Sequence, residues 1–338
     1  MATKRILAID GGGIRGVIPA KVLMAIEAKT GKRIAELFDL IAGTSTGGIL
    51  AAGLCVPTPD RTRPRYDASD LLQLYKKKGH EIFSTNRLRR VVSLFFGAQY
   101  SPAGLETQLQ NYLGEARLAD AFTGLLITSF EMHAGEAWFF SRETARVQPD
   151  RNYLMRDVAR ATSAAPTYFP PFQFAGSNSE APVLVDGGVF ANNPAICAWV
   201  DEHEDIKGTS DVLILSLGTG SVPHPVRFDR ARRWGKVLWA QPAIGSFLDG
   251  QSDTAEFQLG QLLDHSHYLR LQVKLPVANE AMDNASDANI AALETAADAM
   301  LVDPENARRL AAICDQLTAG NSPSGSSPSG SPAGVAVP

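Results

Sequence analysis

Cysteine is scarce in this sequence, which has three in 338 residues, at Cys55, Cys197 and Cys314. An odd number of widely separated cysteines argues against a disulfide framework, and their spacing matches no metal site. We therefore expect a protein of a reducing compartment, with no bound metal and no cofactor.

Long apolar runs and an excess of positive charge are also missing. No run is long enough to span a bilayer, and the run after Arg5 ends at Asp10, which is too short for a signal peptide. The 32 Lys and Arg against 36 Asp and Glu leave a net charge of -4, which provides no field for nucleic acid. We expect a cytoplasmic protein that binds no nucleic acid and contacts membranes only locally; export without a signal peptide would leave no trace in this pattern.

Apolar residues are abundant, at 45% of the chain against 20% charged, which is enough for a large core. Several short apolar runs end in glycine or polar residues, as buried strands do: RILAID (5–10), FDLIAG (38–43), LLITSF (125–130), PVLVDGG (182–188) and VLILSLGTG (212–220). Glycine turns and helix-like stretches follow the first two runs, which predicts a parallel, doubly wound sheet. We expect one catalytic domain over residues 1–318 and a disordered Ser/Pro/Gly-rich tail over 319–338.

The first chemical motif is Gly43-Thr44-Ser45-Thr46-Gly47, which fits the G-x-S-x-G turn that presents a serine nucleophile. Its glycines leave room for a strained backbone, and the N-terminus of the following helix favours a partly anionic hydroxyl oxygen. A plain Gly/Ser turn has the same letters. The position between a strand and a helix favours the nucleophile.

The second motif, from Asp10 through Gly11, Gly12, Gly13, Ile14 and Arg15 to Gly16, also matches the G-x-G-x-x-G dinucleotide fingerprint. That interpretation needs an acidic residue at the end of the second strand, to hold a ribose hydroxyl. Glu36 and Asp39 lie before or at the start of that strand instead. Three successive glycines suit an oxyanion hole better, because their N–H groups can point at one developing negative charge.

The third motif is Asp186-Gly187-Gly188, at the end of an apolar run. An aspartate before glycines is often only a turn former, but a serine hydrolase needs a base at the same sheet edge as Ser45. Histidine is the usual base, and a classical triad is the less favoured mechanism because no histidine here belongs to a motif. The six candidates are His80, His133, His203, His224, His265 and His267.

The motifs and the segments between them resemble the patatin-like phospholipases and are close to the plant patatins. The similar segments occur in the family's order and span nearly everything before the tail. They are DGGGIRGVIPA (10–20), GTSTGG (43–48), ATSAAPTYFPP (161–171), LVDGG (184–188), LSLGTG (215–220) and YLRLQ (268–272).

The resemblance implies a three-layer α/β/α fold with a mostly parallel sheet and a serine esterase that cleaves fatty-acyl esters of phospholipids and related lipids. It implies a dyad of Ser45 and Asp186 without histidine, an acyl-enzyme intermediate, and an oxyanion hole at Gly11, Gly12 and Gly13. The supporting loop positions it implies are Arg15, Gly16, Gly43, Gly47, Gly187 and Gly188. We expect a bacterial member of the family.

Two other hypotheses stay open: a nucleotide-binding oxidoreductase and a catalytically silent storage or interaction protein. For a lipid hydrolase, the segment 230–239 (RARRWGKVLW) mixes cations with Trp234 and Trp239, a composition suited to a lipid interface. An ordinary amphipathic surface helix has the same composition.

Overall fold

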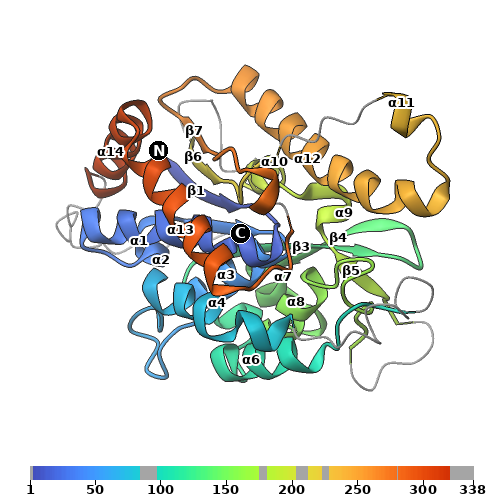
Figure 1. The fold of residues 1–338 in the computed structure, drawn as a ribbon. Coiled ribbons are helices and arrows are strands. Elements are labelled where there is room, and N and C mark those ends of the chain that lie inside the picture. Colours follow the sequence, from blue (N-terminus) through green and yellow to red (C-terminus); the bar gives the residue numbers. More distant parts are fainter. Residues whose placement is uncertain are drawn as a thin grey trace, which may run out of the picture.

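The computed structural model describes residues 3–83, 97–174, 181–202, 212–222, 228–279 and 281–319 (Figure 1). Seven strands in this part of the chain form one sheet. The strands are β1 (Lys4–Ile9), β2 (Leu40–Gly43), β3 (Gly124–Glu131), β4 (Glu136–Ser141), β5 (Leu184–Asp186), β6 (Val212–Leu217) and β7 (Tyr268–Leu271).

Helices follow most of the strands, as the glycine turns predict. The α-helices are α1 (Val17–Thr30), α2 (Ile34–Leu37), α3 (Thr46–Cys55), α4 (Ala68–Ile82), α6 (Ala103–Leu113), α7 (Arg142–Val147), α8 (Met155–Thr162), α9 (Gly188–Ala191), α10 (Ala195–Asp201), α11 (Phe228–Ala231), α12 (Lys236–Leu262), α13 (Asp287–Val302) and α14 (Pro304–Ala319). Short 3-10 helices are η1 (Gly13–Gly16), η2 (Leu118–Asp120), η3 (Pro149–Arg151) and η5 (Val277–Asn279).

The sheet has the order β4-β3-β2-β1-β6-β7, and β5 pairs with β3 beside this path. Strands β3, β2, β1, β6 and β7 run parallel to one another, whereas β4 and β5 run antiparallel to β3. The mostly parallel sheet predicted from the sequence is therefore confirmed. Parallel strands bring their carboxyl ends to one edge, which is where ligands bind in such sheets.

Alternate residues of each strand point to opposite faces of the sheet. In β1, Leu7 and Ile9 pack into a large core with α1, α3, α4, α8 and α13, while Ile6 and Ala8 pack into a smaller core with α10 and α12. Figure 1 shows the sheet between these two sets of helices. This is the three-layer α/β/α arrangement.

Strand β5 departs from the parallel pattern expected for residues 182–188. It has only three residues, and it runs antiparallel to β3 with Val185 opposite Phe130. The physical reason is its place in the sheet. Strand β2 ends opposite Ile127 and β4 occupies the other edge of β3, so β5 fills the edge that β2 leaves open.

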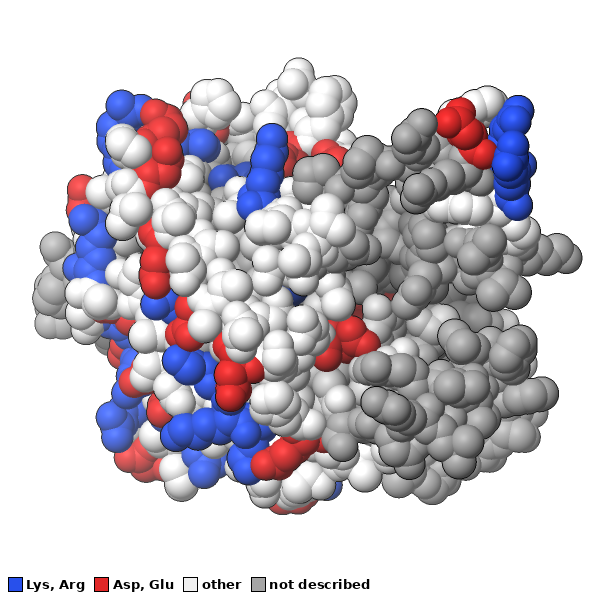
Figure 2. Space-filling model, viewed as in Figure 1, with Lys and Arg blue, Asp and Glu red and all other residues white. Residues whose placement is uncertain are grey.

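Charges of both signs are interspersed on the face shown in Figure 2, over the helices α1, α4, α13 and α14. Within the described ranges, no helix combines the length and apolar character needed to cross a bilayer. Of the predicted tail, Ala319 is the last residue of α14, and residues 320–338 lie outside the described residues.

Candidate active site

Ser45 occupies a sharp turn between β2 and α3. Its backbone has φ 55° and ψ -123°, a conformation that side-chain-bearing residues rarely adopt. The positions 43 and 47 on either side of Ser45 admit only glycine, because the backbone packs closely there. A Cβ on Gly43 would lie 2.2 Å from the Gly47 oxygen, and one on Gly47 would lie 2.1 Å from the Ile9 oxygen. The Ser45 N–H donates to the Thr162 hydroxyl at 2.8 Å. The turn therefore lies between a strand and a helix, at the carboxyl edge of the sheet, as the motif predicts.

Asp186 reaches this turn through strand pairing. Gly43 at the end of β2 lies opposite Ile127 of β3, and Asp186 at the end of β5 lies opposite Ser129, two residues further along β3. Because β5 runs in the opposite direction along the same edge, its carboxyl end meets the carboxyl end of β2. The Ser45 hydroxyl lies close enough to the Asp186 carboxylate to oppose the rise in pKa that burial causes, and both residues line one pocket.

The environment of Asp186 makes its carboxylate more basic. The residue is 5% exposed, and burial raises its pKa to about 7. The nearby Ser45 hydroxyl and a hydrogen bond from the Gly188 N–H, at 2.8 Å, oppose this shift. A carboxyl group with this pKa is half ionised near neutral pH, so it can accept a proton and return it.

The glycine loop follows β1 and leads into η1 and α1. Gly12 and Gly13 line the pocket that contains Ser45 and Asp186. Gly11 differs from the prediction, because its N–H already donates to the Asn192 carbonyl at 3.1 Å. The Gly11 N–H therefore holds the loop, and Gly12 and Gly13 are the loop glycines that line the pocket.

The remaining loop positions are sites of close packing. A Cβ on Gly16 would lie 2.5 Å from the Thr46 hydroxyl, and one on Gly187 would lie 2.1 Å from the Thr128 hydroxyl. A Cβ on Gly188 would lie 3.1 Å from the Asp186 carboxylate. Arg15 is buried in η1. These residues bring the glycine loop, α3 and the base into contact.

The pocket has a volume of about 300 Å³. Its polar and glycine lining residues are Gly12, Gly13, Ser45, Thr46, Ser163, Asp186, Gly188 and Asn192. The other lining residues are apolar or aromatic: Ile49, Tyr75, Ile82, Phe83, Leu105, Ala165, Pro166, Tyr168, Phe169, Val189, Phe247, Leu248 and Met282. Its chemistry suits a long hydrocarbon chain joined to a polar reacting group.

The depth of the pocket is indicated by the exposure of its wall. Leu105 is 2% exposed and Tyr75 is 5% exposed, so they belong to the interior. Phe247 of α12 and Val189 of α9 are 66% and 40% exposed, so they belong to the mouth. The mouth is therefore rimmed by apolar side chains from two helices.

Histidines are not part of this pocket as far as the structure describes them. His80, His133, His265 and His267 are described and do not line it. His203 and His224 lie outside the described residues. In the same part of the chain, no group of acidic, His and Cys side chains could hold a metal.

The segment 230–239 is described in part. The Trp234 and Trp239 rings form an edge-to-face pair with centroids 5.1 Å apart, and Trp239 is 44% exposed. The side chains of Arg230, Lys236, Val237 and Leu238 lie outside the described residues.

The sequence predicted no role for four residues around the site: Thr162, Asn192, Thr219 and Arg270. Thr162 accepts from the Ser45 N–H, and the Thr219 hydroxyl donates to the Gly11 carbonyl at 2.6 Å. Thr162, Thr219 and Arg270 lie in segments that resemble the family, but each reaches its partner only after folding.

Comparisons with known proteins show which family the chain resembles. Residues 7–199 match the model of the family described as "Patatin-like phospholipase". The chain is 34% identical to Patatin-like protein 1 of Oryza sativa subsp. indica over 304 residues, which cover 79% of this chain and 73% of that protein. It is 32% identical to Patatin group J-1 of Solanum tuberosum over 332 residues, which cover 88% of this chain and 84% of that protein.

One solved structure, VipD from Legionella pneumophila, aligns with 94% of this chain and 66% of its own, at 13% identity and a TM-score of 0.43. The bacterial source expected for this chain stays a prediction. The family match and the plant relatives establish that the chain belongs to the patatin-like phospholipase family.

Proposed function

We propose that the protein is a lipid acyl hydrolase in which Ser45 is the nucleophile and Asp186 is its base. The observation that supports this proposal is the proximity of the two side chains, which line the same, largely apolar pocket and interact closely enough for Ser45 to oppose the burial-driven rise in the pKa of Asp186. The acyl chain of a fatty-acyl ester fits the apolar wall, and its carbonyl group then lies beside Ser45.

In the first step the Ser45 oxygen attacks the ester carbonyl carbon while its proton passes to Asp186. The carbonyl oxygen becomes an oxyanion, which the N–H groups of Gly12 and Gly13 stabilise at the N-terminus of η1. Asp186 then gives the proton to the alcohol oxygen as the ester C–O bond breaks. The products of this step are a free alcohol and an acyl-enzyme.

In the second step a water molecule attacks the acyl-enzyme and Asp186 accepts the proton of that water. The same backbone N–H groups stabilise the second oxyanion. Its collapse breaks the bond to Ser45, whose oxygen takes the proton back from Asp186. The fatty acid leaves, and both residues return to their starting states.

An aspartate can serve here without histidine because of its burial. In water a carboxylate of pKa about 4 is a weak base for a hydroxyl group. In the folded protein burial raises the pKa of Asp186 to about 7, near that of an imidazole. The strained turn also exposes the Ser45 hydroxyl directly to the substrate.

The structure argues against the dinucleotide interpretation of the glycine loop, because neither acidic candidate lies where a ribose hydroxyl would bind. The Asp39 carboxylate accepts from the Arg5 N–H at 2.8 Å, and Glu36 accepts from the Arg33 N–H at 2.8 Å. Both contacts lie at the starts of chain elements, away from the carboxyl edge of the sheet. A ribose hydroxyl bound at that edge would not reach either residue.

The decisive experiment compares wild type with Ser45→Ala and Asp186→Asn on a mixed lipid extract, with mass spectrometry of the products. We expect free fatty acids and the matching lysolipids or alcohols from wild type alone. Single His→Ala variants at all six positions serve as controls and keep most of the activity. A fluorophosphonate should label Ser45; failure to label it would favour a silent storage protein, and one inactive His variant would point to a triad.

Contact with a lipid surface is part of this proposal. Val189 and Phe247 lie at the apolar mouth, and Trp239, which is 44% exposed, lies earlier on the same helix as Phe247. A lipid that leaves its bilayer by this route keeps its acyl chain in apolar surroundings. The mouth would then face the bilayer.

Vesicle cosedimentation in a Ser45→Ala background tests this contact without consuming the lipid. We expect Phe247→Ser and Trp239→Ser to weaken binding to phosphatidylcholine vesicles severalfold. Phe257→Ser is the matched control, because Phe257 is 67% exposed on α12 but does not line the pocket. Equal losses in all three variants would show that the mouth has no special role.

A further inference from the structure

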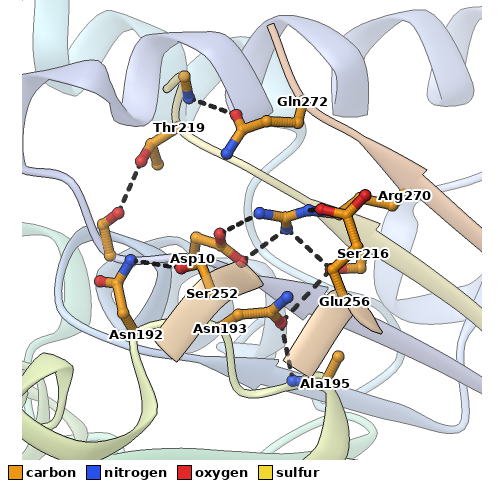
Figure 3. Close-up of polar contacts among 12 residues, drawn as sticks. Asp10, Asn192, Asn193, Ala195, Ser216, Thr219, Ser252, Glu256, Arg270 and Gln272 are labelled. Atoms are coloured by element: carbon orange, nitrogen blue, oxygen red, sulfur yellow. Dashed lines mark hydrogen bonds and ion pairs between the residues drawn. The ribbon is translucent and has the colours of Figure 1, made fainter. Parts of the chain in front are cut away.

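Behind the glycine loop lies a buried ion pair that the proposed reaction does not use. Arg270 of β7 donates to both carboxylate oxygens of Asp10, at 2.9 and 2.6 Å (Figure 3). The side chains are 5% and 2% exposed. Neither residue lines the pocket, so the pair acts on the loop from outside it.

Arg270 is itself held by several neighbours. It donates to the Ser216 hydroxyl at 2.9 Å and lies 3.5 Å from the Glu256 carboxylate (Figure 3). The planar guanidinium group matches both oxygens of one carboxylate at once, a geometry that lysine cannot reproduce. Asp10 is therefore held in one orientation by a partner that is fixed on its other sides.

The loop that follows Asp10 has no side chains of its own to fix it. Glycine has the greatest backbone freedom of any residue, so Gly11, Gly12 and Gly13 need external anchors. The Asp10 N–H donates to the Leu217 carbonyl at 3.0 Å, and the Gly11 peptide is held by Asn192 and Thr219. The Asp10 side chain is the anchor at the point where the loop leaves β1.

Charge gives the pair a second effect on the same loop. An ionised Asp10 is one residue away from a loop that has to stabilise a developing negative charge. The Arg270 cation, which also faces the Glu256 carboxylate, offsets the charge of Asp10 and so reduces its repulsion of the oxyanion.

We propose that Arg270 is a positioning residue of the oxyanion hole, which fixes and neutralises Asp10 and thereby aims the N–H groups of Gly12 and Gly13. The inference rests on the proposed hydrolase function. It extends the catalytic apparatus to β7, far along the chain from every motif that carries the chemistry. Oxyanion stabilisation depends steeply on donor geometry, so a small displacement of the loop lowers the rate.

The test compares Arg270→Lys, Arg270→Gln and Asp10→Asn with wild type on a soluble short-chain ester. Rates are divided by the number of Ser45 sites that a fluorophosphonate titrates, which removes any loss of folded protein. We expect kcat to fall about 10-fold to 100-fold in Arg270→Gln and less in Arg270→Lys, with KM within about twofold of wild type.

A trifluoromethyl ketone gives the second readout, because its adduct with serine carries an oxyanion. Its affinity should fall by the same factor as kcat in each variant. A residue that only stabilised the fold would move neither value per titrated site. Arg156→Gln is the control, because Arg156 donates to the Gly114 carbonyl at 2.8 Å and pairs with Glu115, and does not line the pocket.

Unchanged kcat and ketone affinity per titrated site in the Arg270 variants would overturn the inference, as would a change in KM alone. If Arg270→Gln gives no folded protein, Arg270→Lys and Asp10→Asn decide the result by the same criteria. A wild-type protein that neither labels at Ser45 nor turns over ester would contradict the proposed function. Normal wild-type activity with unaffected Arg270 variants would contradict only this inference.

Discussion

The Ser45 hydroxyl lies beside the Asp186 carboxylate, in a position where Asp186 is almost completely removed from solvent. This contact joins the nucleophile turn after β2 to the antiparallel strand β5. The same burial that supports the proposed role of Asp186 as the base also makes its ionised form costly to the fold. Activity and stability are therefore both expected to depend on this carboxyl group.

The first prediction concerns the pH dependence of the rate. Because burial raises the pKa of Asp186 to about 7, the carboxyl group is protonated and inactive below that pH and ionised above it. We expect kcat on a soluble ester to rise about tenfold per pH unit below about pH 7 and to level off above it.

Asp264→Asn is the control for this profile. Hydrogen bonds from Ser266 and His267 lower the pKa of Asp264 to about 2, and the group is remote from the pocket. Its removal should leave the profile unchanged. A wild-type rate that stays constant down to about pH 5 would show that Asp186 is not the base.

The second prediction concerns stability. In the unfolded chain the Asp186 carboxyl group has the ordinary aspartate pKa of about 4, whereas burial raises the pKa to about 7 in the fold. The folded state therefore keeps the proton in this interval, and the cost of ionising the group is complete only above about pH 7. We expect Asp186→Asn to be inactive but more stable at about pH 8, by roughly 1 to 4 kcal/mol.

Urea denaturation at two pH values measures this difference. The gain should shrink at about pH 4, where the folded state of wild type keeps the proton and the unfolded state is about half protonated. An Asp186→Asn protein less stable than wild type at the higher pH would show that the hydrogen bonds of Asp186 outweigh its desolvation.

The third prediction concerns the glycine loop. A Cβ on Gly12 would lie 2.2 Å from the Thr219 hydroxyl, which holds the Gly11 carbonyl. Gly12→Ala should therefore displace the loop and lower kcat by at least about a hundredfold. The comparison is Gly260→Ala on α12, where a Cβ would meet nothing within 4 Å and should leave kcat unchanged. Ester hydrolysis by both variants measures the effect, and an active Gly12→Ala enzyme would exclude this loop from catalysis.

The fourth prediction concerns acyl-chain length. Leu105 of α6 lines the interior of the pocket, so Leu105→Phe should shorten the space for the chain. We expect kcat/KM for long-chain esters to fall about tenfold relative to short-chain esters, because overpacking opposes binding of the distal carbons. Leu109→Phe is the matched control, because Leu109 is equally buried on α6, at 2% exposed, but does not line the pocket. The ratio of rates along an ester series is the measurement, and a ratio that shifts equally in both variants would locate the acyl chain elsewhere.

Local chemistry in the sequence determined the alternation of strand, glycine turn and helix around Ser45 and after Asp10. The glycines at 43 and 47 can be identified before the fold is known, because a turn this sharp tolerates no Cβ at either position. The apolar runs likewise identify the buried strands, since only a sheet covered on both faces needs them.

Tertiary structure alone decided how the distant pieces meet. No local pattern indicates that β5 runs antiparallel and continues the edge that β2 leaves open, because its pairing depends on where β3 and β4 lie. No pattern separates Gly11, whose N–H is taken by Asn192, from Gly12 and Gly13. Asp186 is desolvated, and Arg270 pairs with Asp10, only when the sheet and α12 exclude water. Both effects depend on residues that are distant in the sequence.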